Sequence, residues 1–343
     1  MMTNEKTQYS LFFSLTWDFL CEYLPKQAGH SQATVESYRD SLTMFRRFLV
    51  DDRHESLAKF KFSDCTKDCI YSFREHLGQG SNKPSTINLR VAAIRSYLNY
   101  AAEKDITVQS AALAISRIKP LKETKNEKET LSEDALAAIL SAPPQTKTGL
   151  RDRAILVILY DSAARLGELL GIKLGDITLD GEYPCIYIHG KGNKDRAVQL
   201  SGKSIGHLKE YIRVFHANSS PTAFLFSTTI KGNTDKMSQG NVQRLLKQYA
   251  DKARQDCPDI PKSVHPHMLR RTRATNLYQD GVAIEMVSTV LGHARVETTK
   301  AHYAKPSVAQ LRDALESVPI PTKEEEPLWV GNEEEMARRC GLR

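Results

Sequence analysis

The sequence lacks long apolar runs, paired cysteines and an N-terminal leader pattern, and each absence argues against a class of protein. No stretch approaches the roughly 20 apolar residues that a membrane helix requires, so we expect no membrane-spanning segment. Six cysteines are scattered over 343 residues, which favours a reducing cytoplasm over a disulfide-stapled secreted fold. The first residues show no basic segment running into an apolar one, which also indicates a cytoplasmic protein.

Motifs for metals and nucleotides are missing as well. Cys65 and Cys69 lie four residues apart without a second Cys or His pair at finger spacing, so a zinc site is not expected. The segment GKGNKD lacks the spacing of a phosphate-binding loop, and neither an H-E-x-x-H motif nor a nucleophile elbow is present. We therefore expect no metal and no cofactor.

What is present is a mild excess of positive charge. Lys and Arg number 48 against 41 Asp and Glu, which gives a net charge of +7 and a pI of about 9.0. This balance favours a polyanionic partner, either nucleic acid or an anionic membrane surface. The 41% hydrophobic and 26% charged residues are typical of a globular chain, and the length suggests two or three domains.

The first part of the chain has the periodicity of helices. Apolar residues recur at steps of three and four after Ser31, a plausible N-cap, and again after Ser85. The first of these two stripes consists of Val35, Tyr38, Leu42, Phe45 and Leu49. The second consists of Ile87, Val91, Ile94, Leu98 and Ala101.

The charged segment KPLKETKNEKET interrupts this periodicity and predicts a boundary. We expect a helical domain at 1–118, a linker at 119–130, a second domain at 131–318 and a tail at 319–343. A solvated loop within one domain is the alternative explanation of the linker. In the tail, Leu328 and Trp329 could anchor a docking segment.

The second domain reads as mostly helical with a small sheet. Ser132 followed by two acidic residues marks a helix start, and residues 151–174 predict a helix that could break at Gly167. Residues 185–190 and 196–200 flank a turn-rich segment and predict a β-hairpin. Gly292 is expected to end an apolar helix. The predicted fold class is mainly α (α+β), with a small antiparallel sheet in the second domain.

Two arginines in this half could bind an anion. His267 and Arg270 are three residues apart, so on a helix they share a face and suit a phosphate, although a basic helix in solvent has the same pattern. Arg165 stands among apolar residues and requires a partner, which Glu168 could supply. A structural ion pair would explain this second pattern equally well.

Other residues could move protons or attack phosphorus. Lys191 and Lys194 lie at the predicted hairpin tip, where an ammonium can hold a phosphate or protonate a leaving oxygen, or merely face solvent. His293 follows Gly292 directly. Tyr303 carries a phenol that becomes a nucleophile if cations stabilise its anion, although most tyrosines are structural.

Four segments together resemble one family. DSAARLGELLGI, IHGKGNKDRAVQL, HPHMLRRTRAT and LGHARVETTKAHYAKP look, in this order, like the tyrosine recombinase (phage integrase) family, which includes Xer-like enzymes and mobile-element integrases. The resemblance extends to the two helical segments of the first domain, which look like the family's SAM-like core-binding domain. The family's catalytic set of Arg, Lys, His-x-x-Arg, His and Tyr is matched by Arg165, Lys191, His267, Arg270, His293 and Tyr303.

The resemblance implies a DNA strand transferase that needs neither metal nor ATP. Tyr303 would attack the scissile phosphate to give a 3′-phosphotyrosine, while Arg165 and Arg270 hold the non-bridging oxygens. Lys191 would protonate the departing 5′ oxygen and His267 would assist proton transfer at the tyrosine. His293 would add a hydrogen bond to the phosphate.

The sequence also departs from the family pattern. Arg271 stands where a second His is frequent, Arg273 where an aromatic residue is usual, and Ala164 where a bulkier residue precedes the first Arg. The two arginines could touch DNA or line the site. Some members place the tyrosine nine residues after the histidine, where this chain has His302, and others place it ten residues after, at Tyr303.

The resemblance further implies a C-shaped clamp on double-stranded DNA and a homo-tetramer on two paired recombination sites, with the tail docking on a neighbouring subunit. Candidate DNA contacts are Lys83, Arg90, Arg95, Lys194 and Arg196. The expected role is integration or transposition of a mobile element. A Xer-type resolvase, a DNA-binding regulator without cleavage activity, a type IB topoisomerase and a metal-dependent nuclease are the competing interpretations.

Overall fold

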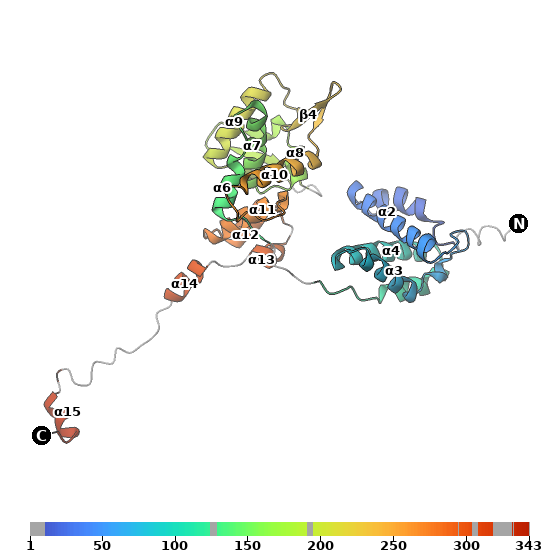
Figure 1. Ribbon diagram of the computed structural model, residues 1–343, viewed down its shortest axis with the longest axis horizontal. Coiled ribbons are helices and arrows are strands. Elements are labelled where there is room, and N and C mark those ends of the chain that lie inside the picture. The colour runs from blue at the N-terminus through green and yellow to red at the C-terminus, as the bar shows by residue number, and fades with distance from the viewer. Residues whose placement is uncertain are drawn as a thin grey trace. The chain divides into compact units, whose positions relative to one another are not determined.

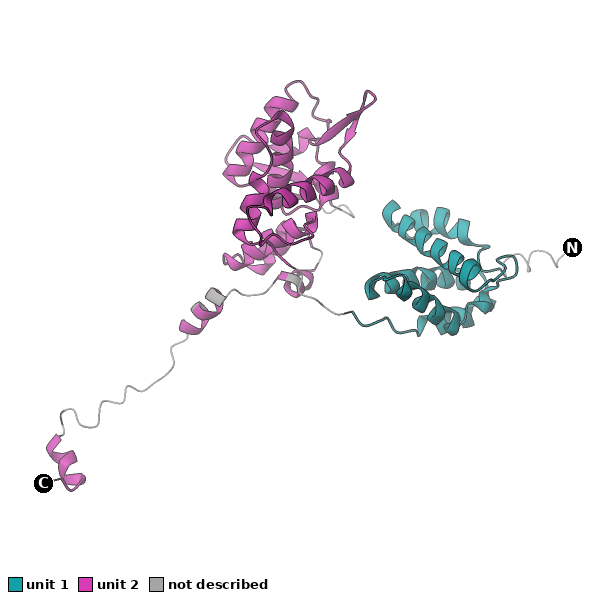
Figure 2. Cartoon of the chain, in the orientation of Figure 1, with its two compact units in different colours: residues 1–127 teal, residues 128–343 magenta. Residues whose placement is uncertain are grey.

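The structure is a computed structural model that describes residues 11–123, 129–190, 195–293, 295–303, 308–317, 331 and 333–342. The chain divides into two compact units, residues 1–127 and 128–343, which are coloured separately in Figure 2. Within the described ranges, no helix has both the length and the apolar character needed to cross a bilayer.

Between residues 11 and 123, unit 1 is built from helices, with one isolated β-bridge between Leu11 and Lys61. Its π-helical segments are η1 (Asp18–Gln27) and η2 (Phe48–Asp52), and its short 3-10 turns are η3 (Phe62–Asp64) and η4 (Ile106–Val108). Its α-helices are α2 (Gln32–Arg47), α3 (Lys67–Gln79), α4 (Pro84–Lys104) and α5 (Gln109–Ser116). The helices enclose an aromatic core in which the rings of Phe12, Phe45 and Tyr97 contact their neighbours.

The two predicted helical stripes of unit 1 are confirmed. Every member of both stripes is buried except Tyr38, which is partly buried against the same core. Ser31 does precede α2, but its hydroxyl pairs with Thr34 Oγ1 at 3.0 Å and does not cap a backbone N–H. The stripes of α2 and α4 therefore form the packing surface of the unit, as their periodicity predicted.

The described residues of unit 2 are mostly helical and form two small sheets (Figure 1). Its first elements are α6 (Glu133–Ser141), α7 (Lys147–Asp161), α8 (Leu166–Gly171), η5 (Leu174–Asp176), β1 (Ile177–Thr178), β2 (Cys185–Ile188) and β3 (Arg196–Gln199). There follow α9 (Gly202–Phe215), β4 (Ser227–Ile230), β5 (Asn233–Lys236), α10 (Gln239–Ala253), α11 (Pro266–Gln279), α12 (Ile284–Leu291), α13 (Val296–Tyr303), α14 (Val308–Glu316) and α15 (Glu333–Arg339).

The predicted hairpin at 185–200 is confirmed. Strands β2 and β3 pair antiparallel with Ile186 opposite Val198 and Ile188 opposite Arg196, and β1 extends them to a three-stranded sheet. The two isoleucines of β2 are fully buried, so this face of the sheet belongs to the core of unit 2. The tip that carries Lys191 and Lys194 lies outside the described residues. The β4–β5 hairpin was not predicted.

The helix predicted over residues 151–174 breaks earlier than expected, and the prediction of a break at Gly167 is wrong. Helix α7 ends at Asp161 and α8 begins at Leu166, so Gly167 lies inside a helix. Ala163 adopts a left-handed conformation with φ of 49°, which a residue with a Cβ rarely does. The break frees the carbonyl of Ala163 from helical bonding, and this carbonyl accepts a hydrogen bond from buried Arg270.

Helices α11, α12 and α13 pack against one another at one end of unit 2 (Figure 1). Gly292 ends α12, as predicted, with φ of 63° and a backbone N–H that returns to the last helical turn. A small apolar cluster of Ala163, Ala274, Val287 and Leu291 packs against Tyr303 from α13. The break after α7 and the ends of α12 and α13 thus meet around α11.

Candidate active site

Arg270 is the most deeply buried charged residue of this region. It lies in α11 with 2% of its surface exposed, and its guanidinium donates to the carbonyls of Ala163 at 2.6 Å and Leu291 at 2.7 Å. In the described part of the chain, no carboxylate lies within ion-pair distance of it. Burial, followed by the nearby cation of Arg165, lowers the pKa of Arg270 to about 10. The fold therefore holds a buried positive charge that an anion would stabilise.

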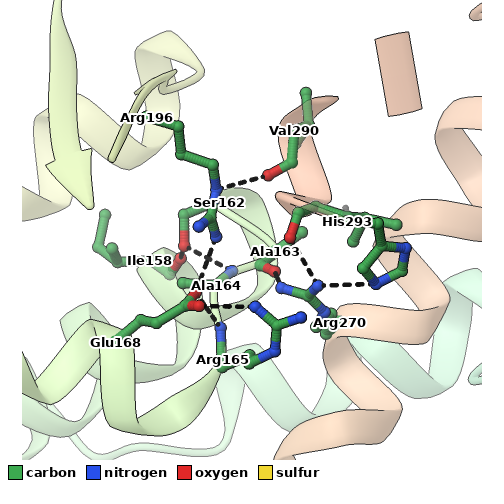
Figure 3. A network of polar contacts seen from close by, with 11 residues as sticks. Ile158, Ser162, Ala163, Ala164, Arg165, Glu168, Arg196, Arg270, Val290 and His293 are labelled. Atoms are coloured by element: carbon green, nitrogen blue, oxygen red, sulfur yellow. Dashed lines mark hydrogen bonds and ion pairs between the residues drawn. The ribbon is translucent and has the colours of Figure 1, made fainter. Parts of the chain in front are cut away.

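Arg165 lies at the N-cap of α8 and is held by Glu168, as the sequence predicted. The Glu168 carboxylate accepts from the Arg165 backbone N–H at 3.0 Å and from its guanidinium at 2.7 Å. The Arg165 side chain keeps 43% of its surface exposed, so it remains open to a ligand. Because Arg165 lowers the pKa of Arg270, the two cations lie within electrostatic reach of each other, and Figure 3 shows their guanidinium groups together.

A third guanidinium, from Arg196 in β3, shares the same carboxylate. Arg196 donates to Glu168 at 2.8 Å and to the backbone carbonyl of Val290 at 3.0 Å. Burial raises the pKa of Glu168, but hydrogen bonds from Arg196 and Arg165 outweigh it, so that the pKa ends below its ordinary value. Two guanidiniums thus pair with one ionised carboxylate, and the guanidinium of Arg270 lies in the same network without such a pair (Figure 3). The excess positive charge suits a phosphate, whose oxygens accept several charge-assisted hydrogen bonds.

His293 links Arg270 to the tyrosine. Its Nε2 lies 3.2 Å from an Arg270 guanidinium nitrogen, and its Nδ1 lies 2.9 Å from Thr299 Oγ1. Because a guanidinium can only donate, Nε2 must accept and Nδ1 carries the proton of a neutral imidazole. The ring lies nearly parallel to that of Tyr303, with centroids 6.2 Å apart.

Tyr303 ends α13 and is half-buried beside this cluster. Its ring packs against the apolar cluster of Ala163, Ala274, Val287 and Leu291 and lies beside the imidazole of His293. The oxygen of a tyrosine attacks phosphorus once its proton has been removed.

His267 lies in the first turn of α11, directly after Pro266, and is partly exposed. Partial burial of the ring, together with the cations Arg270, Arg165 and Arg271 and the neighbouring His265, lowers the pKa of His267. A lowered pKa keeps the imidazole neutral near pH 7, the form that can accept a proton. The structure therefore brings five of the six predicted catalytic residues into one region, and Lys191 lies outside the described residues.

The predicted DNA contacts have varied surroundings. Lys83 is exposed at the start of α4. Arg90 donates to the carbonyl of Ser37 at 3.2 Å, and Arg95 donates to that of Ile118 at 2.9 Å, so both hold segments of unit 1 together. Arg196 has a side chain that is only 9% exposed, inside the site network. Lys194 is not among the described residues, and contact of any of these with DNA stays a prediction.

Arg271 and Arg273 also have internal partners. Arg271 donates to the carbonyl of Glu129 at 2.7 Å. Arg273 pairs with Asp161 at 2.9 Å and lies over the ring of Tyr160 at 5.4 Å from its centroid. These contacts fasten the outer face of α11 to the start of unit 2 and to the end of α7.

Sequence reasoning missed the contribution of backbone carbonyls to this site. Ala163, Val290 and Leu291 supply the acceptors that hold two arginines, and Thr299 orients His293. Carbonyls carry no sequence signal, since every residue has one. Arg196 was identified, but as a residue of the DNA surface.

Comparison with known proteins covers both units. Residues 129–310 match the Phage integrase family, and residues 18–105 match the Phage integrase N-terminal SAM-like domain. A tyrosine recombinase XerC of Natranaerobius thermophilus is 29% identical over 295 residues, which cover 83% of this chain and 92% of that protein. A tyrosine recombinase XerA of Thermococcus kodakarensis is 31% identical over 248 residues, covering 72% and 80% respectively.

Solved structures with the same fold include two recombination enzymes bound to DNA. The Tn1549 transposon integrase in complex with a circular intermediate DNA has a TM-score of 0.68 at 14% identity, covering 88% of this chain and 98% of that chain. The XerH site-specific recombinase bound to a palindromic difH substrate has a TM-score of 0.64 at 20% identity, covering 87% and 82%. At these identities the likeness shows the fold and leaves the chemistry to the site itself.

Proposed function

The chain belongs to the phage integrase family of tyrosine recombinases, and from this premise we propose that it cuts and rejoins DNA at specific sites through a covalent bond to Tyr303. One observation carries the proposal: the excess positive charge of Arg165, Arg196 and Arg270 over Glu168. A phosphodiester gains negative charge in its pentavalent transition state. Guanidiniums already in place stabilise that charge without reorganising.

Each step of the proposed reaction breaks one phosphate ester bond and forms another. The Tyr303 oxygen attacks phosphorus, forms the 3′-phosphotyrosine, and expels the 5′ oxygen of the next nucleotide. Lys191 supplies the proton to that oxygen, and His267 takes the proton of the phenol. The 5′-hydroxyl of another strand then attacks the phosphotyrosine and releases Tyr303. Since one phosphate ester replaces another, the reaction needs no ATP, and the proposed roles leave no step to a metal ion.

The arginines and His293 divide the remaining work. Arg165 is exposed enough to reach a non-bridging oxygen, while the buried Arg270 stabilises the negative charge of the phosphate electrostatically. His293 accepts from Arg270 in the free protein, so we propose that it aligns Arg270. Its bond to the phosphate in the DNA complex then requires that Nε2 carry a proton and donate it. Removing one such donor commonly lowers the rate by about 10²–10³-fold.

We further propose that both units bind one duplex as a clamp, that four copies act on two paired sites in the cytoplasm, and that the tail docks on a neighbouring copy. The net charge of +7 supports phosphate contacts, whose number is measured by the slope of affinity against salt. Lys83 and Lys194 are the first residues to replace, because each removed phosphate contact reduces that slope by about one.

The biological role that we propose is integration or transposition of a mobile element. The fold of the Tn1549 transposon integrase supports this role, whereas the XerC and XerA relatives support a second candidate, a Xer-type resolvase. Plasmids carrying the DNA that flanks the coding region separate the two. An integrase joins two different sites on two DNA molecules, and a resolvase converts a plasmid dimer that carries two copies of one site into monomers.

The test of the chemistry uses a series of overlapping nicked duplexes that together cover the flanking DNA. Beside a nick, cleavage releases a short fragment that carries the free 5′-hydroxyl, and its loss prevents rejoining and traps the covalent intermediate. The wild-type chain should form a covalent adduct that survives denaturing electrophoresis, with EDTA present and ATP absent. Tyr303→Phe should bind the same duplex without an adduct. Retention of the adduct in Tyr303→Phe would refute the assignment, and binding without any wild-type adduct would indicate a regulator.

The same preparation also tests whether the chain acts as a topoisomerase or as a nuclease. Relaxation of any supercoiled plasmid without site preference would indicate a type IB topoisomerase. Loss of cleavage in EDTA would indicate a metal-dependent nuclease.

A further inference from the structure

Arg196 occupies a central position that its place in the sequence does not suggest. It is the first residue of β3, paired with Ile188 at the end of β2, so it lies where the paired strands meet the loop that connects them. A charged residue at a strand end usually projects into solvent. Here the side chain turns inward and keeps only 9% of its surface exposed.

The guanidinium of Arg196 connects two other segments of the site. One nitrogen donates to Glu168, the carboxylate that holds both the backbone and the side chain of Arg165. The Nε–H donates to the carbonyl of Val290 in the last turn of α12. Figure 3 shows Arg196 between these two partners. A single side chain thus joins the strand, the start of α8 and the end of α12.

The end of α12 is held by two arginines at adjacent carbonyls. The last turn of a helix has carbonyls without intrahelical partners, and these favour cations. Arg196 takes the carbonyl of Val290 and Arg270 takes that of Leu291, immediately before Gly292 and His293. The position of His293 is therefore determined by both arginines.

Gly292 leaves just enough room for this arrangement. A Cβ at this position would lie 2.7 Å from an Nη atom of Arg196 and 3.0 Å from its Cζ. The Arg196 guanidinium is consequently packed against the backbone at the end of α12. The guanidinium is therefore held in place by van der Waals contact with Gly292 as well as by its hydrogen bonds.

We propose that Arg196 is a positioning residue for strand cleavage, which locks the Arg165–Glu168 pair to the end of α12 and so sets where Arg165 lies relative to Arg270 and His293. This inference rests on the proposed function for its consequence and on the described contacts for its geometry. With Nε and one Nη bonded and little of its side chain exposed, Arg196 acts through these neighbours and leaves the phosphate to Arg165 and Arg270.

The first test compares Arg196→Gln and Arg196→Lys for adduct formation in a single turnover, with duplex affinity measured separately. A displacement of about 1 Å in a catalytic group costs about 10²-fold, so Arg196→Gln should slow adduct formation by that order while affinity changes little. Arg196→Lys should also be slow, since an ammonium cannot reproduce a planar fork with two directed bonds. A lysine variant with the wild-type rate would show that charge alone matters and would overturn the proposal.

Arg254→Gln is the matched control for a loss of stability. Arg254 pairs with Asp251 at 2.6 Å and donates to the carbonyls of Ile260 and Pro261, so its bonding resembles that of Arg196. Its hydrogen-bond partners in the described part of the chain, Asp251, Ile260 and Pro261, lie outside the site. Arg254→Gln should lower the urea midpoint and leave the rate per folded molecule unchanged. An equal loss of rate in the two glutamine variants would overturn the positioning role.

A double-mutant cycle tests the lock from its other side. Gly292→Ala introduces the collision with Arg196 as well as backbone strain at φ of 63°, and in the Arg196→Gln background only the strain remains. Gly292→Ala should therefore slow adduct formation by a larger factor in the wild type than in Arg196→Gln. If Gly292→Ala slowed adduct formation by the same factor in both backgrounds, the proposed lock would be contradicted.

Hydrogen exchange tests the geometry without relying on activity. The Arg165 amide bonds to the Glu168 carboxylate and the His293 amide bonds to the Ser288 carbonyl, so both report on the two ends of the lock. Arg196→Gln should speed the exchange of both amides, and Arg254→Gln should not. Unchanged exchange in Arg196→Gln would overturn the lock. A wild-type chain that forms no adduct would refute the proposed function alone, and the exchange rates would still decide the inference.

Discussion

Replacement of Arg270 by glutamine should separate catalysis from stability. The fold lowers the pKa of Arg270 to about 10, well below its ordinary value, which corresponds to a penalty of about 3 kcal/mol for the charged form. The folded pKa lies below the unfolded one, so the penalty is present in full below pH 10. The penalty fades only as the pH rises from about 10 towards the higher pKa that Arg270 has in the unfolded chain. At neutral pH the free protein therefore bears the whole penalty.

The glutamine variant removes this penalty and loses hydrogen bonds in exchange. The carbonyls of Ala163 and Leu291 lose their donors, at about 1–3 kcal/mol for each that stays unpaired, although the glutamine amide can serve one of them. The two contributions nearly cancel, so the free energy of unfolding should stay within about 2 kcal/mol of the wild type. Adduct formation should fall by about 10²–10³-fold or more.

Urea unfolding and the adduct assay measure the two quantities on the same preparation. Inorganic phosphate should also raise the unfolding temperature of the wild type more than that of Arg270→Gln, because only the wild type gains a partner for its buried charge. A loss of more than about 4 kcal/mol in Arg270→Gln would refute this reasoning and make Arg270 a structural residue. Equal stabilisation of both proteins by phosphate would refute it as well.

Three further predictions concern groups around the site and in the fold. Glu168→Gln should lower the free energy of unfolding and slow adduct formation at pH 7. Because the pKa of Glu168 is depressed, the difference in stability between the wild type and this variant should shrink in urea titrations as the pH falls below about 4.3. His189 bonds to Asp195 at 3.0 Å and to Asp176 at 3.3 Å, and these bonds raise its pKa. The protonated ring therefore stabilises the fold in acid, and this contribution is lost as the pH rises through the folded pKa. His189→Gln should lower the urea midpoint at pH 5.5 and leave it nearly unchanged at pH 8.5. Ser132→Ala removes the hydroxyl that caps α6 and should cost about 1 kcal/mol of unfolding free energy, with adduct formation retained.

Local periodicity made two helices of unit 1, α2 and α4, predictable. The stripes of α2 and α4 follow from spacing within each helix, and burial of their members needs only a second apolar surface. The end of α12 was equally local, since Gly292 adopts the left-handed conformation that a helix end commonly requires.

The break between α7 and α8 could not be predicted in this way. It places a left-handed Ala163 where nothing in the local sequence demands one. The demand comes from Arg270, 107 residues further on, whose buried guanidinium needs the Ala163 carbonyl. The β4–β5 hairpin was missed for a different reason. Its strands are largely exposed and polar, and its turn depends on positive φ at Lys231 and Gly232.

The candidate site was predictable as a set of side chains and not as an arrangement. The order of motifs identified Arg165, Arg270, His293 and Tyr303, and the structure brings them together. The inward turn of Arg196 depends on Glu168 and on a carbonyl of α12, which only the folded chain brings within reach.

The identity of the residue that carries the DNA tests the account most directly. After trapping on a nicked duplex, the protein is digested with nuclease and protease, and the modified peptide is sequenced by mass spectrometry. The account predicts a nucleotide 3′-phosphate on the oxygen of Tyr303. A nucleotide on any other side chain, such as Tyr278 of α11, or one attached through its 5′-phosphate, would contradict it.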